Sequence, residues 1–504
     1  MIQYDLIRHP LTIGCLFLLG YFAACPERIA ANDRPATMPN IVVLLVDDLG
    51  AMDIGANNPD TFYETPNIDR LAAEGTRFTQ GYAACCVCSP TRYSMMTGKY
   101  PARTGATNFF SGVRAERFNP APLYNRMDTE EFTLAEAFQE AGYKTAFFGK
   151  WHLGPTPEFW PENQGFDINF GGCGLGSPPS WVSPYRNPRL ADGPDGEFLT
   201  ERLSREAANF IKQTKDSPFL LYFSFYQVHV PLWAPEALVQ KYREKARRLG
   251  LPNTNEALFD SEEQHLLTDD ARLVRTRQTH AVYAAMVESM DTAVGRVVDA
   301  LRDEGLLENT IICFLSDNGG LSTAEGSPTS NLPLRGGKGW QYEGGNRIPF
   351  IIRVPGVGEQ VSHCPVITND IYPTMLELAG LPARPQQHLD GVSLAPIFKG
   401  QETIERDGLY WHYPHYSNQG GQPGGAVRVG DWKMIRNYEN GRVSLYNLQD
   451  DPSERNDLAE KEPLRARDLA AKHDRWLQSV GAKFLQEKDG QEPWKPDYLR
   501  TQSR

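Results

Sequence analysis

One segment decides the fold class: Asn40-Ile41-Val42-Val43-Leu44-Leu45-Val46-Asp47-Asp48. Its unbroken apolar run is typical of a parallel strand that is buried on both faces. Three further apolar runs also end in polar residues: Tyr143–Phe148 before Gly149-Lys150-Trp151-His152, Phe219–Tyr226 before His229, and Thr310–Leu315 before Ser316-Asp317-Asn318. Open α/β sheets bind ligands at the carboxyl ends of their strands, so these polar residues should converge on one site.

Helical segments alternate with these runs. A helix should begin at Thr65 and run through Ala73, and Ala281–Leu301 has the pattern of a long amphipathic helix. A fifth strand is expected over Arg347–Val354. The alternation predicts an α/β fold with a central, mostly parallel sheet sandwiched by helices.

The pattern changes beyond Lys399-Gly400. Short strand-like pieces follow at Gly408–His412, Ala426–Val429, Trp432–Asn437 and Val443–Asn447, and a helix is expected over 463–477. We therefore expect a larger domain over 38–398, followed by a smaller α+β subdomain with an antiparallel sheet over 400–490.

Charge and cysteine content narrow the function classes. The 504 residues carry a formal net charge of −12, which argues against nucleic acid as a partner because phosphate binding needs a basic face. The scattered cysteines do not form a disulfide framework. A zinc site at Cys85, Cys86 and Cys88 is rejected, because no second Cys/His cluster has suitable spacing.

The first 31 residues predict an export signal and an unstructured start. The apolar run Leu11–Ala24 follows a basic start and is too short for a comfortable membrane span. Cys25, after Phe22-Ala23-Ala24, resembles the lipidated residue of a bacterial lipoprotein, and simple cleavage between Ala24 and Asn32 is the alternative. We expect a periplasmic or extracellular protein that touches a membrane only through such an anchor.

A short motif, Cys88-Ser89-Pro90-Thr91-Arg92, stands before a helix-like segment. Pro90 suits the first helical turn, so a group at position 88 should face backbone N–H donors and the positive end of a helix dipole. Arg92, one turn along, can fold back over the same point. The motif predicts a nucleophile beside a bound oxyanion, whereas the alternative is a buried cysteine that packs as a small hydrophobe.

The polar strand ends are rich in oxygen ligands. Asp47, Asp48, Asp317 and Asn318 suit Ca²⁺ or Mg²⁺ better than zinc. Taken singly, Asp47-Asp48 could equally be a helix cap or a turn pair, and Asp317-Asn318 a turn before glycines.

Together these pieces carry a family resemblance. They occur in this order: Val46-Asp47-Asp48-Leu49-Gly50, Cys88-x-Pro90-x-Arg92 with Thr97-Gly98, Gly149-Lys150-Trp151-His152-Leu153-Gly154, His229, Ser316-Asp317-Asn318-Gly319 and Gly337-Lys338-Gly339. Over nearly the whole mature chain the sequence resembles the type I sulfatases, the formylglycine-dependent family of the alkaline phosphatase superfamily. The resemblance makes residues 38–398 the catalytic domain of a sulfuric ester hydrolase. It also implies one Ca²⁺, in preference to Mg²⁺, completed by residue 88 and a sulfate oxygen.

The resemblance also implies the chemistry at position 88. In the family this cysteine is converted by a formylglycine-generating or sulfatase-maturing enzyme to formylglycine (3-oxoalanine), which reacts as an aldehyde hydrate. One hydroxyl attacks sulfur and expels the alcohol, and the second lets sulfate leave. The remaining roles carried over are Arg92 holding the hydrate, Lys150 and Lys338 binding sulfate, His152 acting as base and His229 as general acid.

The substrate is less well defined by the sequence. The aromatic and histidine-rich stretch Tyr410–Tyr416 suggests that His412 or His415 reaches a sulfated saccharide, and core packing is the alternative. Two other functions are considered. A phosphonate or phosphate ester hydrolase is disfavoured because no histidine near Asp317-Asn318 could hold a second metal, and a non-catalytic glycan-binding relative is disfavoured because the motif residues are intact.

Overall fold

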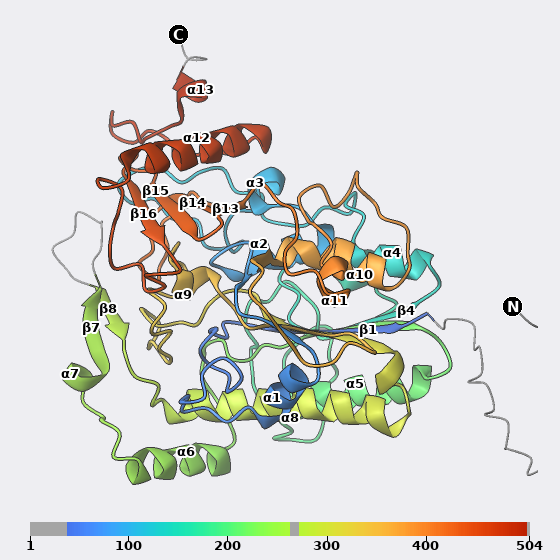
Figure 1. The fold of residues 1–504 in the computed structure, drawn as a ribbon. Helices are drawn as coiled ribbons and strands as arrows, with labels where there is room; N and C mark the ends of the chain where they lie inside the picture. The colour runs from blue at the N-terminus through green and yellow to red at the C-terminus, as the bar shows by residue number, and fades with distance from the viewer. Residues whose placement is uncertain (1–37, 263–271, 501–504) are drawn as a thin grey trace, which may run out of the picture. The chain divides into compact units, whose positions relative to one another are not determined.

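The central feature is an eight-stranded sheet with helices on both faces (Figure 1). The computed structural model describes residues 38–262 and 272–500, and the chain from Met38 onward forms one compact unit. In spatial order the strands are β11 (Gln360–Ser362), β2 (Thr76–Phe78), β10 (Phe350–Arg353), β9 (Thr310–Ser316), β1 (Asn40–Val46), β6 (Phe219–Ser224), β4 (Lys144–Gly149) and β5 (Ile168–Phe170).

The middle of this sheet is parallel, as the sequence predicts. β1 pairs in parallel with β9 and β6, and β4 pairs in parallel with β6 and β5. The exception is β10, which is shorter than the strand expected over 347–354 and runs antiparallel to both β9 and β2. The chain between β9 and β10 contains only the one-turn helix α9 (Glu343–Asn346), and an antiparallel neighbour needs no helical crossover.

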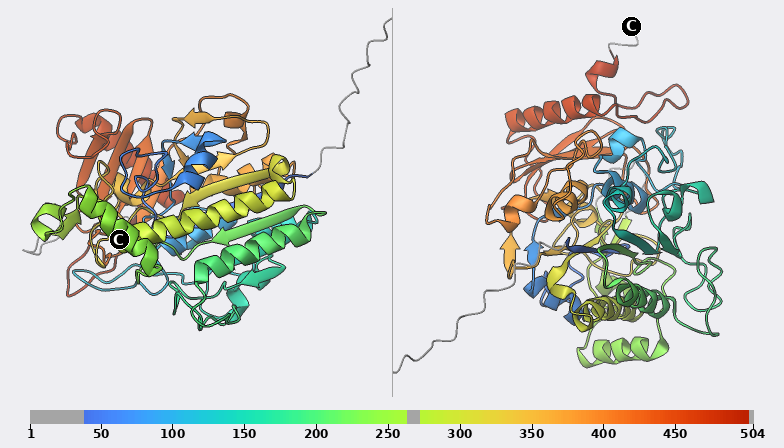
Figure 2. Two further views of the ribbon diagram at one scale, coloured as in Figure 1. Left: turned by 90° about the horizontal axis from the view of Figure 1, so that it is seen from below. Right: turned by 90° about the vertical axis from the view of Figure 1, so that its right-hand side faces the viewer.

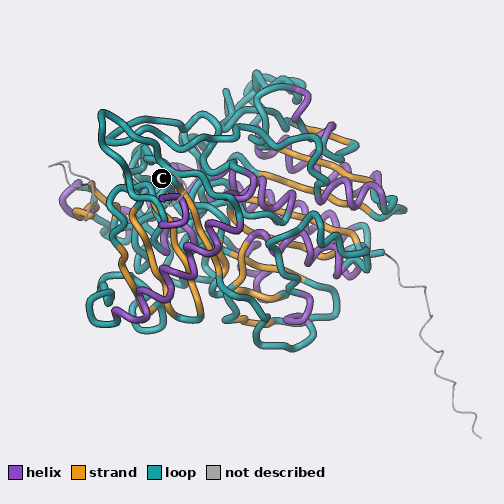
Figure 3. The backbone as a smooth tube through the Cα atoms, turned by 90° about the horizontal axis from the view of Figure 1, so that it is seen from above, coloured by secondary structure: helices purple, strands orange, loops and turns teal. Residues whose placement is uncertain are grey.

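Alternate residues of β1 enter two separate cores. Val42 and Leu44 pack among α1 (Pro66–Ala73), α5 (Leu199–Thr214), α6 (Glu236–Arg248) and α8 (Ala281–Asp303). Ile41 and Val43 pack among α2 (Cys88–Thr97), α4 (Leu134–Glu140), α10 (Ile371–Leu378) and α11 (Ala395–Phe398). Both faces of the strand are therefore buried, which explains its unbroken apolar sequence. Figure 2 shows α5 and α8 lying side by side beneath the sheet, and Figure 3 shows helices and loops over its strands.

A second sheet follows near the C-terminus. It has four antiparallel strands in chain order: β13 (Leu409–Tyr413), β14 (Gly424–Val429), β15 (Trp432–Asn437) and β16 (Val443–Asn447). Helix α12 (Pro463–Ser479) packs on it through Ala466, Leu469 and Ala470 (Figure 1). The expected small antiparallel sheet is confirmed, while the domain boundary between 398 and 400 stays a prediction.

Short elements complete the described chain. They are β3 (Gly81–Tyr82) paired with β12 (Val366–Ile367), β7 (Phe259–Glu262) paired with β8 (Arg272–Arg275), the helices α3 (Pro101–Thr104), α7 (Asn255–Leu258) and α13 (Asp497–Arg500), and the 3-10 turns η1 (Pro157–Phe159), η2 (Pro161–Asn163), η3 (Leu307–Asn309) and η4 (Thr368–Asp370).

The export prediction falls on residues that the structure does not describe. The signal over 1–31 and the lipidation of Cys25 both lie there, so they stay predictions. Within 38–262 and 272–500, every helix is too short or too polar to cross a bilayer.

Candidate active site

Cys88 occupies the position that its motif predicts. It is the first residue of α2, after an extended Val87, and its side chain is buried. Its Sγ lies 3.4 Å from Nδ1 of His152. Burial raises the pKa of the Cys88 thiol, although Lys150 and Lys338 oppose this rise. A thiolate nucleophile needs a lowered pKa, so this environment does not favour chemistry by the thiol itself.

Arg92 lies one turn along α2 and is also buried. Its Nε donates to Oδ2 of Asp317 at 2.8 Å, and its Nη2 lies 2.7 Å from the same oxygen. Its Nη1 donates to the carbonyl of Lys150 at 2.8 Å. Arg92 therefore joins the end of β9 to the end of β4 and fixes both relative to Cys88.

Two aspartates at the end of β1 each face a lysine. Nζ of Lys150 lies 2.5 Å from Oδ2 of Asp47, and Nζ of Lys338 lies 2.8 Å from Oδ2 of Asp48. Asp48 has a φ of 64°, in the left-handed region that residues other than glycine rarely adopt. Such strained positions are concentrated at functional sites, because the surrounding structure must hold them in place.

Two oxygen atoms in this cluster are buried without a hydrogen-bond donor. They are Oδ1 of Asp47 and Oδ1 of Asn318. Neighbouring polar atoms are paired: Nδ2 of Asn318 donates to Oδ1 of Asp48 at 2.8 Å, and Oδ1 of Asp317 accepts from the Asp48 amide at 3.2 Å. A buried oxygen without a donor costs free energy, so a hard cation is a chemically suitable partner for this pair.

With Asp47 ionised, the formal charges of the cluster balance. Asp47, Asp48 and Asp317 contribute three carboxylates, while Arg92, Lys150 and Lys338 contribute three cations. Burial raises the pKa of Asp47 well above its usual range, and Lys150 opposes that rise. Burial acts in the same direction on Asp48, but Lys338, His229 and Lys150 together outweigh burial and hold the pKa of that carboxyl well below its ordinary value. One added divalent cation would give the cluster a net positive charge, which suits an anionic ligand.

Two histidines lie at the edge of the cluster. Burial and then Lys150 lower the pKa of His152, and burial and then Lys338 lower the pKa of His229 to about 3, so both rings are neutral near pH 7. Nδ1 of His229 lies 2.6 Å from the Val230 carbonyl, which can only accept, so the proton is assigned to Nδ1. Nε2 of His229 is then an acceptor, 3.7 Å from Oδ2 of Asp48.

The structure thus brings ten of the predicted site residues together. Cys88, Arg92, Lys150, His152, His229, Lys338, Asp47, Asp48, Asp317 and Asn318 come from α2, from the chain after β1, β4, β6 and β9, and from the loop before α9.

Ser224, the last residue of β6, also belongs to the site, although its role was not predicted from the sequence. Its Oγ accepts from Nη1 of Arg92 at 2.5 Å and donates to the Lys150 carbonyl at 2.7 Å. The available signal was one small polar residue at the carboxyl end of an otherwise apolar strand. Ser224 therefore completes the anchoring of Arg92.

His412 does not lie where a substrate-binding role requires. Its Nδ1 is 2.8 Å from the Tyr438 hydroxyl and its Nε2 is 2.8 Å from the Lys483 carbonyl, so both ring nitrogens are already paired. The ring packs against Phe484 and Tyr438 inside the C-terminal part of the chain. The expectation that His412 reaches the substrate is corrected, and its structural role is core packing.

His415 is also buried, but only one of its ring nitrogens is paired. Its Nε2 lies 2.8 Å from Oγ1 of Thr107, and its ring packs against Tyr413. Its Nδ1 is buried without a hydrogen-bond partner, so the substrate contact expected of His415 stays a prediction. The contact with Thr107 attaches His415 to the loop that begins there.

The structural role of His412 gives a first prediction. In His412→Ala the hydroxyl of Tyr438 and the carbonyl of Lys483 both lose a buried partner, which should lower the free energy of unfolding by about 1–3 kcal/mol. The KM for substrate should stay within twofold of wild type. Urea unfolding and initial rates measured below the transition check this, and a tenfold rise in KM with unchanged stability would restore the binding role.

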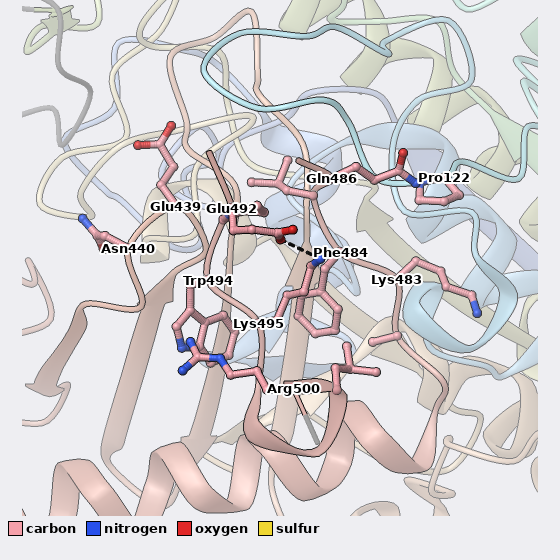
Figure 4. A pocket seen from close by; sticks show the side chains of 14 residues that line it. Pro122, Glu439, Asn440, Lys483, Phe484, Gln486, Glu492, Trp494, Lys495 and Arg500 are labelled. Carbon is pink, nitrogen blue, oxygen red and sulfur yellow. Dashed lines mark hydrogen bonds and ion pairs between the residues drawn. The ribbon is translucent and has the colours of Figure 1, made fainter. Parts of the chain in front are cut away.

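A separate cavity lies in the C-terminal part of the chain. It has a volume of about 980 Å³, and Figure 4 shows Phe484, Trp494 and Arg500 among its lining. Lys495 and Glu492, which also line it, form an ion pair at 3.1 Å. All ten residues of the Cys88 cluster lie outside its lining.

Comparison with known proteins identifies the family. The sulfatase family model matches residues 39–381, and the model described as N-sulphoglucosamine sulphohydrolase, C-terminal, matches residues 337–479. A sulfatase of Formosa agariphila is 31% identical over 92% of each chain. The N-acetylgalactosamine-6-sulfatase of Sus scrofa is 34% identical over 74% of this chain and 68% of its own. A crystal structure of Ps i-CgsB in complex with k-i-k-neocarrahexaose has a TM-score of 0.71 and 29% identity, over 88% of this chain and 93% of that one.

The chain therefore belongs to the sulfatase family, with the alkaline phosphatase-like fold of that family. It is a sulfuric ester hydrolase, and the cluster around Cys88 is its candidate active site.

Proposed function

We propose that this sulfatase hydrolyses a sulfate ester on a saccharide, using formylglycine made from Cys88 and one Ca²⁺. The observation that carries the proposal is the pair of buried, unpartnered oxygens on Asp47 and Asn318, beside a side chain at the N-terminus of α2. A helix N-terminus favours an anion, and the orphan oxygens favour a cation. A sulfate ester bound to a metal ion needs both of these features, a site for the anion and ligands for the cation.

The donor set fits a calcium ion. Carboxylate and amide oxygens of Asp47, Asp48, Asp317 and Asn318 would hold it, with residue 88 and a sulfate oxygen completing the shell. Asp47, Asp48 and His229 can bring one ligand atom each within 4.8 Å of one another, but Ca²⁺ prefers the oxygens. The ion would supply positive charge that polarises bound oxygen atoms, and the aldehyde hydrate would supply an oxygen nucleophile with a second hydroxyl for sulfate release.

The residues of the chain then divide the remaining work. Lys150 and Lys338 place two ammonium groups in a dry site, where they bind sulfate oxygens and stabilise developing charge. His152 is neutral and lies next to residue 88, so its ring can accept a proton there. His229 must first gain a proton at Nε2, and an anionic substrate beside it favours that uptake before the proton passes to the leaving oxygen.

Relatives support a saccharide as the substrate class. Several are named N-acetylgalactosamine-6-sulfatases, and the structure with 29% identity holds a neocarrahexaose. We propose a galactose- or N-acetylgalactosamine-type sulfate for this chain. Conversion of Cys88 by a maturing enzyme and action outside the cytoplasm belong to the same proposal.

The decisive measurement is the intact mass of the peptide that contains Cys88. In an active preparation we expect this peptide to be lighter than its unmodified form by about 18 Da, since CH₂SH is replaced by CHO. The same preparation should turn over 4-nitrophenyl sulfate much faster than 4-nitrophenyl phosphate. The hydrate CH(OH)₂ has the same nominal mass as CH₂SH, so the formylglycine proposal is refuted by an active protein whose peptide shows neither the loss of about 18 Da nor reaction with a hydrazine aldehyde probe. A preference for phosphate would refute the proposed substrate chemistry.

A further inference from the structure

The active site meets solvent at its histidines. The side chains of Lys150 and Lys338 are 0% and 3% exposed, while that of His229 is 16% exposed. His152 is 9% exposed, more than any of the carboxylates of the cluster. When the sulfate group lies inside the cluster, the rest of the substrate must therefore extend out of the site past His152 and His229.

Phe110 lies at this opening. Its ring centroid is 6.3 Å from that of His152, and the two rings are tilted by 60°. Phe110 is half-buried, with part of its ring packed against the core that contains Ile41 and Val43, and Ser111 and the residues 113–117 that follow it are exposed. An apolar ring at the mouth of a polar, charged site has a face that water solvates poorly, which suits the C–H face of a sugar ring.

The loop that carries Phe110 is held in one conformation. Oδ1 of the buried Asn108 accepts from the Phe109 amide at 2.9 Å and from the Tyr413 hydroxyl at 3.0 Å. Its Nδ2 donates to the carbonyl of Gly112 at 3.0 Å, and the Gly112 amide donates to the Phe109 carbonyl at 2.8 Å. A loop closed in this way presents Phe110 with little loss of conformational entropy on binding.

The loop is also anchored to the second sheet. Tyr413 is the last residue of β13, and His415, two residues on, contacts Thr107. Burial lowers the pKa of His415 to about 3, so this contact is made by a neutral ring across the physiological range. His415 is thus a positioning residue for the loop over residues 107–112.

We infer that Phe110 determines substrate specificity by stacking on the sugar ring of the sulfated saccharide beside His152. The inference rests on the proposed function and deepens it, because it assigns the contact with the saccharide to a residue outside the sulfate-binding cluster. The ligand it selects is a pyranose with an unsubstituted apolar face next to its sulfate group.

The test compares variants of Phe110 on N-acetylgalactosamine 6-sulfate, galactose 6-sulfate and N-acetylgalactosamine 4-sulfate. For the best of these substrates, Phe110→Ala should raise KM about tenfold, which corresponds to a stacking contact of about 1.4 kcal/mol. Inhibition by inorganic sulfate, which has no ring to stack, should stay within twofold of wild type. Phe110→Trp should restore KM, while Phe110→Leu keeps apolar bulk for folding and should remain impaired.

The matched control is Phe132→Ala, another half-buried phenylalanine, which packs under Arg384. It should leave KM unchanged. An unchanged KM in Phe110→Ala and Phe110→Leu would overturn the inference, and so would equal shifts in KM and in sulfate inhibition, which indicate an effect through His152. If the wild type turns over 4-nitrophenyl sulfate but none of the saccharides, the proposed substrate class fails and the inference fails with it.

Discussion

Cys88→Ala is expected to abolish sulfatase activity while leaving the fold intact. The side chain is small, and alanine fills most of its volume, so little packing is lost at the start of α2. The proposed nucleophile is lost completely, and loss of a covalent nucleophile lowers kcat by about 10⁴-fold or more. Sulfate release under saturating substrate measures the effect, and thermal unfolding checks the fold.

The control for Cys88→Ala is a second buried cysteine outside the motif. Cys364 is buried in the core cluster that also contains residues of α2 and α10, so Cys364→Ala should cost some stability but retain kcat. Activity within tenfold of wild type in folded Cys88→Ala would show that residue 88 is not the nucleophile. Comparable loss in both variants would trace the effect to packing.

The sequence predicted the parallel centre of the sheet because those strands are buried on both faces. In β1, β6 and β9 every residue is buried. A short, unbroken apolar run is the pattern expected of a strand that is covered on both faces, as central parallel strands are. The polar residues after them were therefore placed correctly at one edge. The direction of β10 was harder to predict, because a short, mostly apolar strand of four residues has the same sequence pattern whether it runs parallel or antiparallel to its neighbours.

The candidate site was predictable where residue type and position agree. Asp47, Asp317 and Lys150 follow strands, and their chemistry has few structural uses in the interior. Ser224 was missed because a serine is common in any environment. His412 was assigned to the substrate because an aromatic, histidine-rich stretch fits a glycan site and a packed core equally well, and only the partners of its two ring nitrogens separate the alternatives.

Asp317→Asn should have the second large effect, on both stability and calcium binding. The carboxylate is fully buried and is the main counter-charge of Arg92, since Asp47 lies farther away at 3.8 Å. Leaving that guanidinium with only the more distant Asp47 should lower the free energy of unfolding by about 3–5 kcal/mol. It also removes one charged ligand of the proposed metal, so activity should fall by about 10³-fold or more.

Calcium linkage separates these two consequences of Asp317→Asn. A ligand that binds only the folded state stabilises it by about 2.7 kcal/mol at a concentration one hundred times Kd, so chelated wild type should gain thermal stability when Ca²⁺ is returned. Asp317→Asn should lose this gain. Asp53→Asn is the matched control, because Asp53 is equally buried and accepts from the Tyr283 hydroxyl and Thr329, yet lies outside the proposed ligand set. It should be destabilised but keep the calcium response, since its oxygens are already occupied by protein donors. A full calcium response in Asp317→Asn would exclude this carboxylate from the metal site and leave it only the role of holding Arg92.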